Sequence, residues 1–94
     1  MIEVMIRDNM IRMEGHAGCS VNGQDIVCSA VSALTCNFIN GMHDISHDEI
    51  KYEIGSGFTQ IEWEDMSETG EILFQSFLLG LGAINQEHNC IKYI

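Results

Sequence analysis

The sequence contains no proline, few basic residues and no apolar region that we expect to cross a bilayer. Its 4 lysines and arginines oppose 14 aspartates and glutamates, which gives a formal net charge of −10. Nucleic acid requires a basic face and is therefore an unsuitable direct partner, whereas a basic protein or peptide suits an acidic surface. The longest apolar region, residues 72–84, is shorter than a membrane span and contains Gln75 and Ser76, so we expect no membrane partner.

A Cys-x-x-Cys pair, an internal repeat, a linker and a low-complexity segment are also missing. The four cysteines are widely spaced, and in a cytosolic protein they should be thiols: Cys19, Cys28, Cys36 and Cys90. The first residues, MIEVMIR, are typical of a strand and not of a signal peptide, so we expect a cytoplasmic protein. Because chains divide into domains only well above 94 residues, residues 1–94 are expected to fold as one domain, and 46% hydrophobic residues allow it to build a core.

Hydrophobic alternation predicts a hairpin at the start of the chain. Residues 2–7 and 10–16 flank Asp8-Asn9, a pair suited to a two-residue turn with positive φ. One face of the hairpin is apolar and carries Ile2, Val4, Ile6, Ile11 and Met13. His16 lies on the polar face, where the second strand enters a loop.

The rest of the pattern predicts two helices and three more strands. Residues 26–39 form a helix ended by Asn40-Gly41, residues 42–49 a polar connector, and residues 50–54 and 58–64 a second hairpin. Ser67 can cap a second helix that runs from Glu68 to about Gln86, and CIKYI closes the chain as a strand.

The order β-β-α-β-β-α-β indicates an α+β protein. We expect two layers, with two helices packed on a mixed or antiparallel sheet of about five strands. The second helix is apolar on more than one face, which favours a homodimer that uses residues 73–81.

The segment GHAGCSVNGQDIVCSAVSAL, residues 15–34, separates a histidine from a cysteine by a small polar loop. With Asp25 as N-cap, Cys28 is the third helical residue, near unpaired backbone N–H groups and the positive end of the helix dipole. This position favours a nucleophilic thiolate, and the same N–H groups can hold an oxyanion. Alternatively, Cys28 is a small buried hydrophobic residue.

His16 becomes a neighbour of Cys28 if the loop folds back, as a Cys–His pair requires; otherwise it is an ordinary surface histidine. Asp25 either caps the helix or orients His16. Ser32, one turn beyond Cys28, is a hydrogen-bonding supporter or a plain helical serine. The loop has few apolar side chains to bury, so we expect it to be mobile. Its residues are Ala17, Gly18, Cys19, Ser20, Val21, Asn22, Gly23 and Gln24.

HDISHDE, residues 43–49, contains a histidine pair four residues apart. Its neighbours are typical of a loop and no cysteine cluster is close, so we expect no metal site there.

The joint pattern of GHAG, a short glycine-containing loop and GQDIVCSAVSAL resembles the ribosomal-processing cysteine protease family, Prp. The likeness is specific over residues 15–32 and loose over the whole chain. It implies small α+β homodimers that act as cysteine endopeptidases. Their substrate is bacterial large-subunit ribosomal protein twenty-seven, from which they remove an N-terminal extension that otherwise prevents functional assembly.

On the matching positions, the resemblance implies that Cys28 is the nucleophile and His16 the general base and acid. Asp25 and Ser32 would be supporting residues, Gly15 would allow close approach at the strand end, and residues 17–24 would form a substrate lid. No metal or organic cofactor is implied. Cys19 departs from the pattern as an extra thiol.

Two other functions remain open on the residues alone. One is a thiol redox sensor that uses Cys28 with Cys19 as its resolving partner. The other is a non-enzymatic acidic module that binds a ribosomal protein, in which Cys28 only packs in the core.

Overall fold

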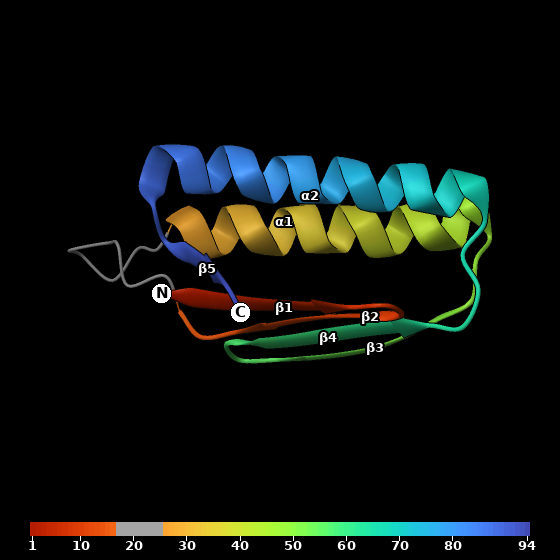
Figure 1. The fold of residues 1–94 in the computed structure, drawn as a ribbon, viewed down its shortest axis with the longest axis horizontal. Helices are drawn as coiled ribbons and strands as arrows, with labels where there is room; N and C mark the ends of the chain where they lie inside the picture. The colour runs from red at the N-terminus through yellow and green to blue at the C-terminus, as the bar shows by residue number, and fades with distance from the viewer. Residues whose placement is uncertain (17–25) are drawn as a thin grey trace.

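The computed structural model describes residues 1–16 and 26–94, in which two long helices lie on one side of a five-stranded sheet (Figure 1). In chain order the elements are β1 (Ile2–Arg7), β2 (Met10–Glu14), α1 (Ile26–Gly41), the π-helical turn η1 (Met42–Ser46), β3 (Ile50–Gly55), β4 (Phe58–Trp63), α2 (Glu68–His88) and β5 (Ile91–Tyr93). The predicted two-layer α+β architecture is confirmed.

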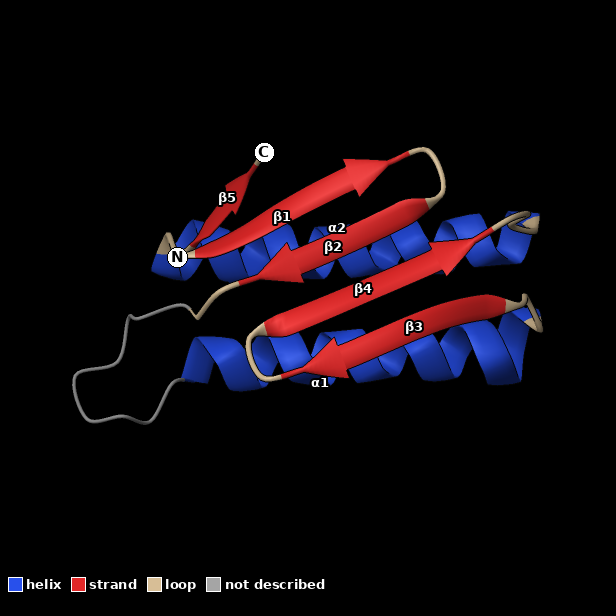
Figure 2. Cartoon of the chain, turned by 90° about the horizontal axis from the view of Figure 1, so that it is seen from below, coloured by secondary structure: helices blue, strands red, loops and turns tan. Residues whose placement is uncertain are grey.

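The sheet is mixed, with strand order β3-β4-β2-β1-β5. The pairs β1–β2, β2–β4 and β3–β4 are antiparallel, whereas β1 and β5, the first and last strands, are parallel. Figure 2 shows α1 behind the β3 side of the sheet and α2 behind β1 and β2. The strand β3 therefore forms an edge of the sheet, close to α1.

The core lies between the sheet and the helices. The apolar face predicted for the first hairpin points into it, and Val4 and Ile11 are fully buried. Four aromatic rings, of Phe38, Trp63, Phe74 and Phe77, join the helices to β4 with centroid separations of 5.1–5.7 Å. Directional ring contacts of this kind add to the free energy of burial.

Residues 26–46 are long and apolar enough to cross a membrane by length and composition, although the sequence analysis singled out only residues 72–84. In the structure this segment packs against the sheet and α2. Its residues Val27, Val31, Phe38 and Ile39 are buried in the core. Core packing therefore accounts for these four apolar residues, whereas Ile26 and Ile45 of the same segment are exposed.

Two local predictions are wrong. Neither Asp8 nor Asn9 has a positive φ, although together they form the predicted two-residue turn. The Asn9 carbonyl accepts a hydrogen bond from the Trp63 N–H (3.1 Å), which continues the sheet to β4 and holds the turn in its plane.

The α-helix ends at Gly41, as predicted, but the predicted polar connector is wrong at its start, because residues 42–46 continue the helical segment as the π-helical turn η1. Met42 is fully buried and anchors this turn, so the segment that looks like a polar connector contains a core residue. The turn ends at His47, which adopts a left-handed conformation with φ 57°. At the start of α2 the predicted cap is present, since the Ser67 hydroxyl accepts from the Gly70 N–H.

Candidate active site

Gly15 and His16 follow the end of β2, where backbone contacts hold them in place. The Gly15 N–H donates to the Gly57 carbonyl (2.8 Å), and the N-terminal ammonium donates to the His16 carbonyl (2.7 Å). Gly15 has φ 105°, and a Cβ there would lie 2.6 Å from the Met1 carbonyl oxygen. Only glycine fits this position without strain, which agrees with close approach at the strand end.

Cys28 is the third residue of α1, as predicted, and is half-buried. The first N–H groups of a helix have no partner within the helix, and they create a positive electrostatic potential at its start. The first turn of α1 contains no acidic side chain that would oppose this potential. Thiolate formation at Cys28 is therefore favoured by its place in the helix.

The cysteines differ in their bonding. Cys28 and Cys36 are thiols outside any disulfide, whereas Cys90 is disulfide-bonded. The expectation that all four cysteines are thiols is therefore wrong for Cys90.

Four of the predicted site residues line one cavity of about 290 Å³: Gly15, His16, Cys28 and Ser32. Asp25 and the predicted lid, residues 17–24, lie outside the described residues. A thiol at a helix start and an imidazole that share a cavity are suited to acyl transfer. The thiol acts as the nucleophile, the imidazole transfers protons, and helix N–H groups stabilise the oxyanion.

The turn between β3 and β4 also lines this cavity, which the sequence analysis did not predict. Ser56 and Gly57 are its two loop residues, and the His16 ring rests on Gly57. The sequence GSG, residues 55–57, indicated a turn, but it gave no sign that this turn would contact His16, which lies far earlier in the chain.

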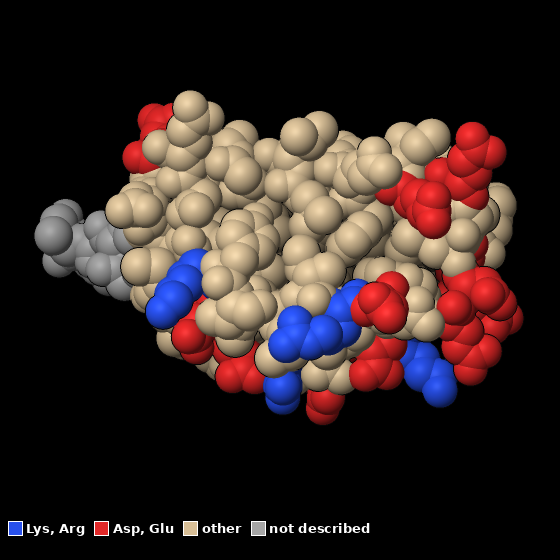
Figure 3. Space-filling view, viewed as in Figure 1, with Lys and Arg blue, Asp and Glu red and all other residues tan. Residues whose placement is uncertain are grey.

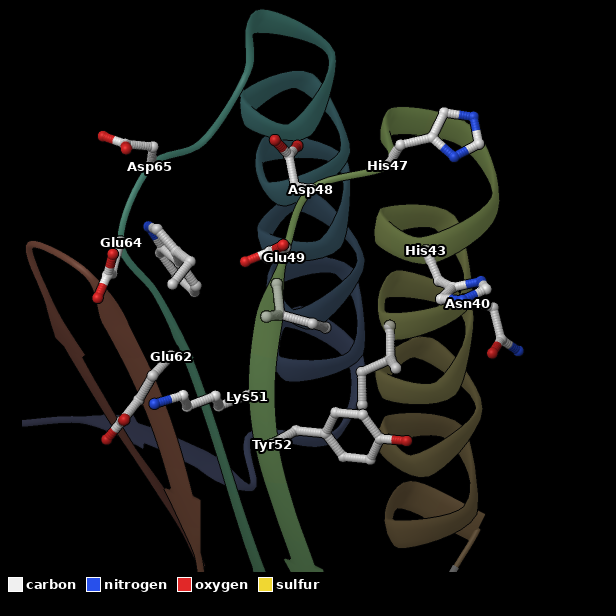
Figure 4. A pocket seen from close by; sticks show the side chains of 13 residues that line it. Asn40, His43, His47, Asp48, Glu49, Lys51, Tyr52, Glu62, Glu64 and Asp65 are labelled. Atoms are coloured by element: carbon white, nitrogen blue, oxygen red, sulfur yellow. The ribbon is translucent and has the colours of Figure 1, made fainter.

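A second cavity, of about 1040 Å³, lies at the opposite end of α1 (Figure 4). Asn40 from α1, His43 from η1 and Tyr52 from β3 contribute to its wall, and the Tyr52 ring points from β3 toward α1. Within the described ranges, 1–16 and 26–94, no three His, Cys, Asp or Glu side chains are grouped as ligands for a metal.

Asp48 lies at the rim of this second cavity and connects it to α2. Its carboxylate accepts hydrogen bonds from the Ser67 N–H (3.0 Å) and hydroxyl (2.8 Å). Slight burial raises the pKa of Asp48, but hydrogen bonds from Ser46 and Ser67 outweigh this and lower the pKa below its ordinary value of 3.8. Asp48 is thus a structural carboxylate that secures the start of α2.

Comparison with known proteins gives a consistent result. The ribosomal processing cysteine protease Prp of Staphylococcus aureus (strain Mu50) is 29% identical over 80 residues, which cover 82% of this chain and 76% of that protein.

Solved structures share the fold. The essential ribosomal processing protease Prp from S. aureus, in complex with a covalently linked product peptide, matches with a TM-score of 0.84 at 23% identity, covering 98% of this chain and 94% of that one. SMU.848 from Streptococcus mutans matches with a TM-score of 0.77 at 24% identity, covering 98% and 89% of the two chains.

The family model for cysteine protease Prp matches residues 1–93. Since that match leaves out only the last residue, the chain belongs to the Prp family and is a cysteine protease.

Proposed function

We propose that this protease removes the N-terminal extension of bacterial large-subunit ribosomal protein twenty-seven and thereby supports ribosome assembly. The observation that carries the proposal is the cavity shared by Cys28 and His16, in a chain related to ribosomal processing proteases. A net charge of −10 suits a basic ribosomal substrate. Residues 1–94 would act as a single cysteine-protease domain in the cytoplasm.

In the proposed mechanism, His16 takes the proton of the Cys28 thiol, and the resulting thiolate attacks the scissile carbonyl carbon and forms a tetrahedral oxyanion. N–H groups at the start of α1 stabilise that oxyanion. His16 then donates a proton to the leaving amine as the C–N bond breaks, which leaves an acyl-enzyme on Cys28. His16 next takes a proton from water, whose oxygen attacks the acyl carbon and releases the product and the thiolate.

The supporting roles follow the same geometry. Gly15 lets the strand end approach the first residues of the chain, and Ser32 lies one helical turn beyond Cys28 in the shared cavity. Asp25, as cap or orienter, and residues 17–24, as a substrate lid, are proposed from the sequence alone.

The proposed homodimer is supported by the outer face of α2. Leu79 is 76% exposed and Ile72 is 61% exposed, whereas Phe77 and Leu81 are buried in the core. The candidate interface therefore includes only the exposed side of residues 73–81, around Leu79, and extends to Ile72 just before them.

The test is to incubate the protein with the extended ribosomal precursor and to determine the product masses. One cleavage within the N-terminal extension, absent with Cys28→Ala, is the expected result. A precursor that stays intact, or is cut equally by the Cys28→Ala variant, would contradict the proposed function.

A further inference from the structure

One face of α1 carries small and polar side chains at intervals of four residues: Cys28, Ser32, Cys36 and Asn40. Residues four apart share a helix face. Cys28 is half-buried and the other three are exposed, while Val27, Val31 and Phe38 occupy the core face. This open face runs from the nucleophile to the far end of the helix.

The strand β3 is an edge that has a single strand partner, β4, in the described part of the chain. An edge strand presents unpaired N–H and C=O groups on its outer side. Tyr52 and Ile54 are 57% and 53% exposed and alternate along β3 with the charged residues Lys51 and Glu53.

These two walls line both cavities. Near the nucleophile, Cys28 and Cys36 of α1 face the same space as Ile54 and Gly55 of β3. At the far end, Asn40 of α1 shares the second cavity with Ile50 and Tyr52 of β3.

The walls also agree in length. The helix rises by roughly 18 Å between Cys28 and Asn40, and the six residues of β3 extend over about 20 Å. The two cavities therefore lie at the two ends of the same pair of walls, the Cys28–Asn40 face of α1 and β3, which we call the trough.

The far end of the trough is acidic. Its lining has one lysine, Lys51, against five carboxylates, those of Asp48, Glu49, Glu62, Glu64 and Asp65. Figure 4 shows Glu62 and Glu64 on the β4 side of β3, with their carboxylates turned away from α1, and Figure 3 shows acidic side chains gathered at the end of the molecule where α2 begins. Basic side chains of an extended peptide suit this end by charge.

We propose that β3 and the Cys28–Asn40 face of α1 bind the substrate as an added, extended strand, with the scissile bond at Cys28 and basic residues at the acidic end. An added strand gains affinity from main-chain hydrogen bonds and specificity from alternate side chains. At about 3.3 Å per residue, the basic residues lie roughly five to seven residues from the scissile bond. This inference rests on the proposed function only in taking Cys28 as the nucleophile.

Binding to the Cys28→Ala variant tests the trough without catalysis. The probes are fluorescein-labelled dodecapeptides that span the cleavage junction of the precursor, each N-methylated at one residue. In a strand, successive N–H groups point to opposite sides. We expect the dissociation constant to rise about fivefold or more at every second position, where a hydrogen bond to β3 is lost, and little in between. Dissociation constants that show no alternation along the peptide would overturn the proposal that the substrate binds as an added strand.

Charge reversal tests the acidic end. Glu49→Lys and Glu64→Lys, each combined with Cys28→Ala, should weaken binding of peptides that carry lysine five to seven residues from the junction by about threefold. The same variants should bind the glutamate-substituted peptides more tightly. Glu87→Lys on α2 makes an equal change in net charge and should have neither effect. Equal responses from all three variants would overturn the assignment of this end.

Sedimentation distinguishes a bound peptide from the other possible occupant of the β3 edge, a second copy of the protein. Saturating peptide should leave the oligomeric state unchanged, and dissociation of a dimer on peptide binding would show that a second copy holds the edge. If the trough binds the peptide but the wild-type protein does not cleave it, the proposed function is contradicted and the binding proposal is not.

Discussion

The imidazole of His16 rests directly on Gly57: a Cβ added to Gly57 would lie 2.8 Å from His16 Nε2. Gly57 also has φ 66°, a conformation that side chains other than glycine rarely adopt. The β3–β4 turn therefore forms the surface that sets where the His16 ring can lie.

Gly57→Ala should lower kcat/KM by about tenfold or more, because the added methyl group displaces the ring from Cys28, and a 1 Å misplacement can cost that much. An alanine held at this positive φ should also reduce the free energy of unfolding by about 1 kcal/mol. Gly82→Ala, on α2 and outside both cavities, is the control, since a Cβ there contacts nothing within 4 Å. Equal activity of the two variants would show that the contact does not position His16.

Cys28→Ala should abolish cleavage of the ribosomal precursor and leave the fold intact, because a small side chain replaces another of similar size. Cleavage is followed by product mass and the fold by circular dichroism. Cys36→Ala, which removes the second thiol of the same cavity, should retain kcat at saturating peptide, because Cys36 lies on the proposed peptide-binding face but is not the nucleophile. Wild-type turnover by Cys28→Ala would exclude it as the nucleophile.

His16→Ala should reduce kcat by about 10²–10⁴-fold, the usual contribution of general acid–base catalysis. The limb of the pH–rate profile that reports the base should also disappear. His43→Ala, in the second cavity, provides a histidine control that should keep the profile. If the His16 variant also keeps the wild-type profile, another group transfers the proton.

Asp48→Asn should destabilise the protein near neutral pH and much less in acid. Because the folded state lowers the pKa of Asp48 below 3.8, its carboxylate stabilises the fold above that value, and this stability is lost as the pH falls through the folded-state pKa. Urea denaturation at pH 7 and pH 3 measures the difference between variant and wild type. Ser67→Ala, which removes the cap and a partner of Asp48, should cost about 0.5–2 kcal/mol at pH 7. A destabilisation that is the same at both pH values would refute the role of ionised Asp48.

Leu79→Lys should convert the proposed homodimer to a monomer, because a charged side chain would replace the most exposed large apolar residue of α2. Analytical ultracentrifugation at micromolar concentration measures the mass. Ile45→Lys changes an equally apolar residue on η1 that is 62% exposed and should leave the mass unchanged. A monomeric wild-type protein would contradict the dimer itself.

Local signals account for what the sequence predicted. Alternation placed Ile2 and Val4 on the core face, and Ser67 marked the start of α2, because each signal depends on near neighbours in the chain. Position within a helix likewise singled out Cys28. The joint motif then indicated the family, and the family match selects the protease among the functions left open.

Long-range packing explains what the sequence did not predict. The contact of His16 with Gly57 arises because β4 pairs with β2, which brings a distant turn to the end of β2. The helical turn at Met42 depends on burial against other elements, which residues 42–49 do not encode in their polar pattern. The trough, too, is formed by two elements that only the sheet order brings together.

The parallel pairing of β1 with β5 affects the order in which parts of the fold can form. Ile2 pairs with Ile91, so the strand that supports Gly15 and the His16 carbonyl gains its second neighbour from the far end of the chain. Contacts between such distant residues form late, because closing a long loop costs entropy. During synthesis, the histidine would therefore be fixed beside its cysteine only after the last strand has left the ribosome. The active site would then be completed by the pairing of β5 with β1, and not by the segment that contains His16 and Cys28 alone.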